Sequence, residues 1–157
     1  MLRNLLYKKE YTTDYFYDTP TLLFYNQHAQ VGIRKAANSF MGYVCSNHQV
    51  LNTFRLSELP KHLMVDGVSV SLKGSVSTER SMFCISNEIV FILDKDVCLD
   101  EEFFELNIEY SNDVEDSVQG ILILVQDLIG RTLKPLSFNK SDRLFKQLSE
   151  NRGDIFA

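Results

Sequence analysis

The sequence lacks several features that would assign it to a class at once. No apolar run reaches the length that spans a bilayer, and we expect neither a transmembrane helix nor a secretory signal peptide. The three cysteines, Cys45, Cys84 and Cys98, form no C-x-x-C pair. An odd number of cysteines in a chain without a signal peptide indicates reduced thiols, so we predict a cytoplasmic location.

Metal-ligating histidines and an excess of positive charge are also missing. The three histidines, His28, His48 and His62, lie far apart without the spacing of a metal site, and we interpret them as surface residues. The chain has 16 Lys and Arg against 21 Asp and Glu, a net charge of −5. This balance argues against a general nucleic-acid binder, although a basic pocket can lie inside an acidic shell. We therefore predict no nucleic-acid partner and no membrane partner.

What the chain does have is the composition of one folded domain. Its 157 residues are 45% hydrophobic, which is enough for a core, and they contain no internal repeat, low-complexity segment or linker. We predict a single domain over residues 1–157. About eight short strands, mostly antiparallel, with flanking helices predict the α+β class.

Apolar periodicity places the expected elements along the chain. Alternation with β-branched or aromatic residues predicts strands at 11–17, 29–35, 42–47, 50–55, 78–85, 88–93 and 103–110. Helical spacing predicts short helices at 2–9, 21–26 and 57–64, a long helix from Val114 to Gly130, and a final helix capped by Asn139 with Asp142 at its third position. Residues 68–73 fit either a strand or a helical turn, and the acidic run 94–102 is expected to be a loop.

The predicted strand at 103–110 has one apolar and one acidic face. Alternation places Glu105, Asn107 and Glu109 on one side, opposite Phe104, Leu106, Ile108 and Tyr110. Carboxylates this close repel each other unless they meet water, cations or a metal. Such a strand suits the wall of a barrel that is apolar outside and charged within. The alternative is a half-buried strand of an ordinary antiparallel sheet with its polar face in solvent.

Five segments, in order along the chain, resemble the motifs of one family. The segment 14–20, Asp-Tyr-Phe-Tyr-Asp-Thr-Pro, is similar to the family's Y-F-D-T-P box. The others are 30–34 (L-R-I-R), 74–80 (G-s-l-t-T-x-R), 104–109 (E-L-E-x-E) and 139–143 (S-K-x-x-R). Together they resemble the CYTH proteins, also called triphosphate tunnel enzymes, in their bacterial inorganic-triphosphatase-like and adenylate-cyclase-like branch.

The resemblance implies an antiparallel eight-stranded barrel, complete or lacking a strand, that encloses a tunnel. Basic side chains in such a tunnel hold inorganic triphosphate or a nucleoside triphosphate, and acidic ones hold Mg²⁺ or Mn²⁺. Carried over by position, the phosphate-binding residues are Arg34, Arg80, Lys140 and Arg143, and the catalytic, metal-binding residues are Glu105 and Glu109. The alternative for each is an ordinary solvated charge, such as a strand arginine paired with a surface acid.

The chain also departs from the family pattern. Gly32 replaces the first arginine of L-R-I-R, and Asn47 stands where the following hairpin strand ends in lysine. Met82 stands where an acid follows the second clamp, and Asn107 replaces the central acid of E-L-E-x-E. Because the motifs here contain fewer basic and fewer acidic residues than those of the family, we expect weakened hydrolysis. The alternative is a non-catalytic module of the same fold that binds polyphosphate or nucleotide, or serves only in interactions. Nothing in the sequence favours adenylate cyclase activity.

The family's opening E-x-E-x-K strand has no counterpart before the first matched segment. A barrel without one strand has two open edges, and open edges pair readily with other chains. We therefore predict either a homodimer formed through the open sheet edge or a tunnel that opens as a cleft.

Overall fold

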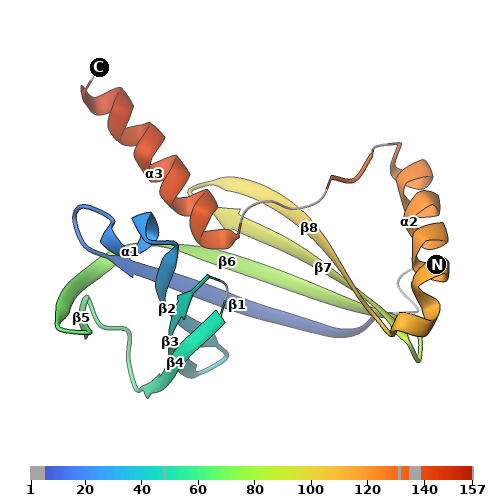
Figure 1. Cartoon of the computed structure of the whole chain (residues 1–157), viewed down its shortest axis with the longest axis horizontal. Helices are drawn as coiled ribbons and strands as arrows, with labels where there is room; N and C mark the ends of the chain where they lie inside the picture. Colours follow the sequence, from blue (N-terminus) through green and yellow to red (C-terminus); the bar gives the residue numbers. More distant parts are fainter. Residues whose placement is uncertain (1–5, 48, 131, 135–138, 157) are drawn as a thin grey trace. The chain divides into compact units, whose positions relative to one another are not determined.

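The computed structural model describes residues 6–47, 49–130, 132–134 and 139–156 (Figure 1). Within them lie eight strands, three α-helices and one short 3-10 helix, Asn112–Val114. The strands are β1 (Leu6–Asp18), β2 (Ala29–Ala36), β3 (Ser39–Ser46), β4 (Gln49–Leu56), β5 (His62–Val65), β6 (Val68–Ser86), β7 (Ile89–Cys98) and β8 (Glu101–Tyr110). The helices are α1 (Leu23–Asn26), α2 (Glu115–Ile129) and α3 (Lys140–Phe156). The predicted α+β class is confirmed.

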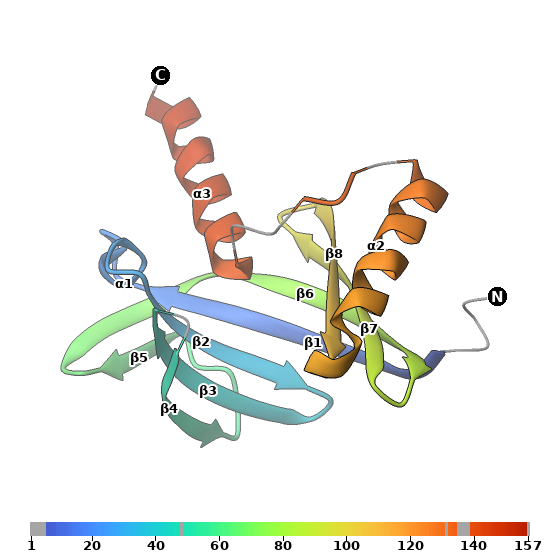
Figure 2. The same cartoon turned by 45° about the vertical axis from the view of Figure 1, so that its right-hand side comes forward.

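All eight strands belong to one sheet, in the order β4-β3-β2-β1-β6-β7-β8, with β5 pairing with β6 (Figure 2). The pairs β1–β2, β2–β3, β3–β4 and β5–β6 are antiparallel, as their short connections require. In the described part of the chain no pairing joins β4 to β8, so the sheet is not closed. The predicted eight-stranded, mostly antiparallel sheet is therefore present in its open form.

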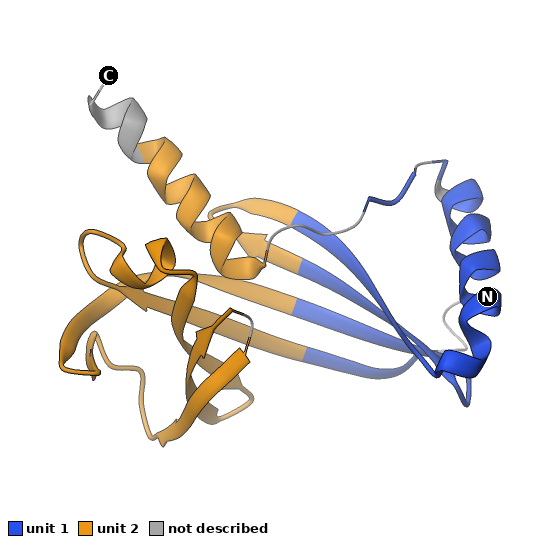
Figure 3. Cartoon of the chain, viewed as in Figure 1, with its two compact units in different colours: residues 1–10, 79–95, 103–137 blue, residues 11–78, 96–102, 138–157 orange. Residues whose placement is uncertain are grey.

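Two compact units divide the chain (Figure 3). Unit 1 comprises residues 1–10, 79–95 and 103–137, and unit 2 comprises residues 11–78, 96–102 and 138–157. The strands β1, β6, β7 and β8 each contribute residues to both units. The division therefore runs across strands, and the single domain predicted over 1–157 stays a prediction.

The core of unit 2 lies among its strands and helix α1, which contributes Phe24. Its fully buried members include Tyr17, Val31 and Ile33, whose odd positions on β1 and β2 share one face. On the even face, Phe16 meets the ring of Phe145 on α3 edge to face, with centroids 6.5 Å apart. Helix α3 is thus seated on the even face of β1.

The core of unit 1 forms where α2 covers β6, β7 and β8. Val118 of α2 packs with Ile89 and Phe91, and the partly buried residues around them are Phe83, Ile85, Leu106, Ile108, Val114, Ile121, Leu122 and Val125. As predicted, α2 ends before Gly130, which takes the left-handed conformation of a helix C-cap. No helix in the described residues is both long and apolar enough to cross a bilayer.

Two predicted helices are wrong. Residues 6–9 belong to β1, and residues 2–5 of that prediction lie outside the described part of the chain. The helix expected at 57–64 is replaced by β5, which pairs with the start of β6 across Asp66 and Gly67. Both turn residues have positive φ, 48° and 78°, as an Asp-Gly type I′ hairpin requires. This hairpin also resolves the ambiguous segment 68–73 as strand.

The loop expected over the acidic run 94–102 is also wrong. Strand β7 continues to Cys98 and β8 begins at Glu101, so only Leu99 and Asp100 form the turn. The strand tolerates its acids because Asp94 and Asp96, both buried, bind cationic side chains described below.

Candidate functional site

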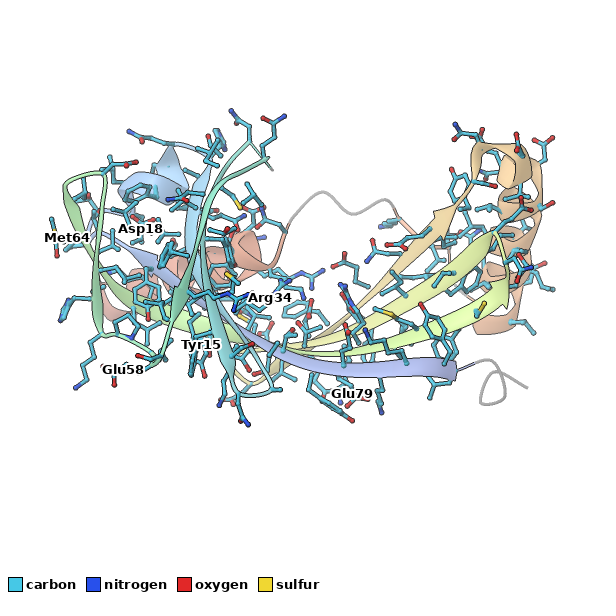
Figure 4. The ribbon with its side chains drawn as sticks, turned by 90° about the horizontal axis from the view of Figure 1, so that it is seen from below. Tyr15, Asp18, Arg34, Glu58, Met64 and Glu79 are labelled. Atoms are coloured by element: carbon cyan, nitrogen blue, oxygen red, sulfur yellow. The ribbon has the colours of Figure 1, made fainter. Side chains whose placement is uncertain are left out.

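Arg34 of β2 lies opposite Asp14 of β1 in the sheet register. Its guanidinium donates through Nε and Nη2 to the two carboxylate oxygens of Asp14, at 2.8 and 2.9 Å. The Asp14 side chain is 1% exposed, whereas that of Arg34 is 49% exposed. Figure 4 draws and labels the Arg34 side chain. The tyrosine hydroxyl of Tyr43 also donates to Asp14, at 3.4 Å. This two-point ion pair holds the arginine in a fixed orientation on the even face of β1.

A second cluster in unit 2 surrounds the fully buried Asp96 of β7. Its carboxylate accepts a hydrogen bond from the Thr78 hydroxyl at 2.5 Å and ion pairs from Lys140 and Arg143 at 3.3 and 3.2 Å. The Lys140 ammonium donates in turn to the Thr78 hydroxyl at 2.6 Å. The lysine and arginine side chains are only 17% and 10% exposed. Asp96 therefore gathers two predicted phosphate-binding residues in one place.

The start of α3 positions these two cations. The amide of Asp142 donates to the Asn139 side chain at 2.9 Å, and the amide of Asn139 donates to the Asp142 carboxylate at 3.0 Å. This reciprocal capping confirms the predicted cap and fixes where the helix begins. Lys140 and Arg143, three positions apart, then lie on the same side of its first turn.

The two clusters of unit 2 lie on the same face of the sheet. The hydroxyls of Thr13 on β1 and Ser77 on β6 meet at 3.2 Å. Since side chains alternate along a strand, Asp14 and Thr78, each one residue further, both point to the opposite face. That face is the one on which α3 is seated. Arg34, Lys140 and Arg143 are thus brought to one side of unit 2.

Unit 1 holds the remaining predicted arginine. Arg80 of β6 donates to both carboxylate oxygens of the buried Asp94 at 2.7 and 2.6 Å. This hydrogen-bonded pair, with the nearby charges of Asp94, Glu10 and Glu105, raises the pKa of Arg80 above its ordinary value, although burial opposes the rise. The predicted Glu105 therefore lies within electrostatic range of Arg80. Glu109 is exposed four residues further along β8, a separation of about 13 Å along the strand.

Several motif positions have structural roles. Asp18 of the Asp14–Pro20 motif is buried and accepts hydrogen bonds from the amides of Thr19, Phe24 and Tyr25, at 2.7, 3.1 and 2.9 Å. These bonds satisfy the orphan amides at the start of α1. The motif aspartate therefore caps a turn.

The positions that depart from the family pattern are also occupied structurally. The Met82 sulfur accepts a hydrogen bond from the Tyr7 hydroxyl at 3.6 Å, and the Asn107 amide donates to Glu105 at 3.2 Å. Asn47 follows β3, in a turn, with a φ of 48°, a conformation that asparagine adopts more readily than lysine. Each departure thus fits its local contacts.

The sequence interpretation missed the three aspartates that bind the predicted cations. The family resemblance includes Asp14 in a motif without giving it a role, and the sequence predicts a loop at Asp94 and Asp96. A signal was present, because Ile92, Asp94, Asp96 and Cys98 alternate with Leu93, Lys95 and Val97 in the pattern of a strand. Only the pairing of those acids with particular cations had no local signal.

The resemblance implies a bound Mg²⁺ or Mn²⁺, which would need oxygen ligands close to one another. Within the described part of the chain, no three His, Cys, Asp or Glu side chains form a group that could hold a metal ion. Asp94 and Asp96 are engaged by arginine and lysine instead. The described residues therefore do not fit a metal caged by protein ligands, and the assignment of Glu105 and Glu109 as metal ligands stays a prediction.

Comparisons with known proteins place this arrangement in a fold class. No protein-family model and no curated protein matches the sequence. Solved structures do match. A putative adenylate cyclase from Bacillus halodurans is 15% identical, with a TM-score of 0.61 over 87% of this chain and 83% of its own. The PH1819 protein from Pyrococcus horikoshii is 16% identical, with a TM-score of 0.62 over 95% and 90%.

A third match is to a putative adenylyl cyclase from Hippeastrum, described as having a dominant triphosphatase activity. It is 12% identical to this chain, with a TM-score of 0.68 over 93% of this chain and 86% of its own. At these identities the likeness establishes the fold. The chain has the CYTH, or triphosphate tunnel, fold that its five motifs resemble.

Proposed function

We propose that this protein binds inorganic triphosphate or a nucleoside triphosphate through the basic side chains of unit 2. The observation that carries the proposal is the pair Lys140 and Arg143, held by Asp96 and Thr78 at the start of α3. A triphosphate carries several negative charges, which arginine forks and lysine ammonium groups complement. The N-terminus of a helix adds amide donors and a favourable dipole.

Preorganisation supports the same proposal. Binding an anion with flexible surface lysines costs side-chain entropy, whereas side chains already fixed by buried carboxylates have lost it on folding. Arg34, on the same face and half exposed, is fixed in the same way by Asp14. The triphosphatase activity described for the Hippeastrum protein of the same fold supports a triphosphate as the ligand.

Binding can be tested by calorimetry with sodium tripolyphosphate. We expect Lys140→Met to weaken binding by about tenfold or more, since a charge-assisted contact contributes about 1.5–3 kcal/mol. Lys146→Met is the matched control, because this lysine lies on the same helix with its side chain 64% exposed. Its affinity should equal that of the wild type. Absence of binding by the wild type, or equal weakening by both variants, would refute the proposal.

We further propose that hydrolysis is slow. Mg²⁺ commonly binds through substrate phosphates and one or two carboxylates, so the metal would enter as its complex with triphosphate. The carboxylates proposed for such a complex both belong to unit 1: Glu105, which lies beside Arg80, and Glu109, each a separate candidate because they lie about 13 Å apart along β8. Asn107 and Met82 stand at two positions where the family motifs carry acids. Fewer carboxylates are therefore present than metal-assisted hydrolysis usually employs.

Phosphate release from tripolyphosphate with Mg²⁺ or Mn²⁺ measures this activity. We expect slow release that Glu105→Gln lowers by about tenfold or more, because a charged ligand is removed. Glu150→Gln on the exposed side of α3 is the control and should leave release unchanged. Equal rates for wild type and Glu105→Gln would end the enzyme hypothesis and leave binding alone.

A second candidate is a module that has kept the fold without the ligand. It is favoured by the finding that Arg34, Arg80, Lys140 and Arg143 each bind a buried aspartate. Buried ion pairs can serve the specificity of packing alone. In that case Lys140→Met would lower the stability of the protein, and the wild type would give no heat of binding with triphosphate.

A further inference from the structure

Gly32 of β2 lies beneath the ring of Tyr43. The two residues are direct partners in the β2–β3 register, so their side chains share a face. A Cβ atom at position 32 would collide with the Cζ, Oη and Cε2 atoms of that ring, closer than real Cβ atoms approach. The tyrosine thus occupies the space that any side chain at position 32 would need. In the resembling motif that side chain is an arginine.

The face shared by Gly32 and Tyr43 is the proposed anion-binding face. Gly32 lies two positions before Arg34 on β2, so a side chain at position 32 would lie on the same face of the sheet as Arg34. The Tyr43 hydroxyl donates to Asp14, the carboxylate that fixes Arg34. Burial and the charge of Asp14 raise the pKa of Tyr43 well above its ordinary value, although Arg34 opposes the rise. Tyr43 therefore contributes a neutral hydroxyl where the motif would supply a guanidinium.

We propose that Tyr43 is a specificity-determining residue of this face, whose ring limits how many phosphates of a bound anion the face can contact. The inference rests on the proposed function and names its ligand preference. With the space above Gly32 filled, Arg34 is the single guanidinium on β2, and the third phosphate of a triphosphate gains little over a diphosphate. The protein therefore discriminates poorly between anions of two and three phosphates.

A second glycine–aromatic pair in the same strands provides a matched control. Gly42 of β3 is covered by the ring of Phe54 on β4, its partner in register. Because Gly42 and Tyr43 are consecutive, the Phe54 ring lies on the opposite face of the sheet, which carries the core. Removing the Phe54 ring creates a comparable hole without changing the proposed anion face.

The experiment measures the affinities of pyrophosphate and tripolyphosphate by calorimetry at fixed salt and pH. We expect the wild type to bind the two anions within about threefold of each other, and Tyr43→Ala to prefer tripolyphosphate by about tenfold. Tyr43→Phe keeps the ring and should keep the ratio of the wild type. Phe54→Ala should keep it too. Tyr43→Leu, which leaves a smaller hole, should shift the ratio in the same direction as Tyr43→Ala, and it serves if the alanine variant does not fold.

The outcomes separate the inference from the function beneath it. If wild type and variants bind both anions with one unchanged ratio, the specificity role is refuted while anion binding stands. The same follows if Phe54→Ala shifts the ratio as much as Tyr43→Ala, or if Tyr43→Phe shifts it as Tyr43→Ala does. If neither anion binds to wild type or variants, the proposed function and the inference fail together. A shift confined to Tyr43→Ala and Tyr43→Leu supports both.

Discussion

A buried carboxylate is stable only when its charge is met by donors or cations. Asp14, Asp94 and Asp96 are each at most 1% exposed, and each binds one or more of the predicted basic residues. The same contact that stabilises the acid also fixes the cation. At the scale of single residues, stability and the proposed anion site are therefore coupled.

This coupling predicts unequal effects within the pair of Asp14 and Arg34. Arg34→Met should lower the free energy of unfolding by about 3 kcal/mol. The substitution removes the guanidinium from the buried Asp14 carboxylate, which keeps the hydrogen bond from the Tyr43 hydroxyl. Asp14→Asn should cost about 1 kcal/mol, because the half-exposed guanidinium can be solvated by water. Urea unfolding of both variants measures the difference.

The control for this comparison is Arg55→Met. Arg55 is exposed on β4, so its loss should change stability by less than about 0.5 kcal/mol. Equal losses for Arg34→Met and Asp14→Asn would show that burial of Asp14 does not govern the energetics of the pair.

At the scale of strands and helices, turns and caps explain which predicted elements were right and which were wrong. Asp66-Gly67 is an Asp-Gly pair, the strongest short sequence signal for a β-hairpin. The prediction of a helix at 57–64 did not use this signal. The turn of Leu99 and Asp100 also has two positive φ angles, 46° and 68°, but leucine gives no signal for that conformation. Helix α3 was predictable because Asn139 and Asp142 form a local capping pattern. The predicted elements were therefore right where a local pattern was used, as at the cap of α3, and wrong where such a pattern was not used or was absent.

The end strand β4 carries the prediction about assembly. Its Val50 and Leu51 are 61% and 66% exposed, and among the described residues β3 is the one strand that pairs with it. An antiparallel β4–β4 pair between two copies would satisfy the same edge groups by two-fold symmetry. We expect light scattering after size exclusion to give twice the chain mass of 18.1 kDa.

Two substitutions distinguish pairing through the β4 edge from association through other exposed apolar residues. Leu51→Lys should produce the monomer mass, because an edge charge opposes strand pairing. Leu128→Lys, at a leucine 78% exposed on α2, should leave the dimer intact. A wild type that elutes as a monomer at all concentrations would rule this interface out.

At the scale of the whole molecule, the fold is shared with proteins only 12–16% identical to this chain. Such divergence is tolerated because a sheet needs alternating apolar positions and suitable turns rather than particular side chains. The positions at which the family motifs carry charges are less constrained by the fold itself. That is why Gly32, Asn47, Met82 and Asn107 can depart from the family pattern within the same architecture.

The sequence alone determined the class of fold, most strands, both long helices and which elements carry the four basic residues. It could do so because periodicity and capping are local properties of the chain. Only the tertiary structure decided which acid binds which cation and which ring covers which glycine. Those contacts join residues as far apart as Thr78 and Lys140, 62 positions along the chain. They depend on strand register and on where α3 is seated, which no local pattern specifies.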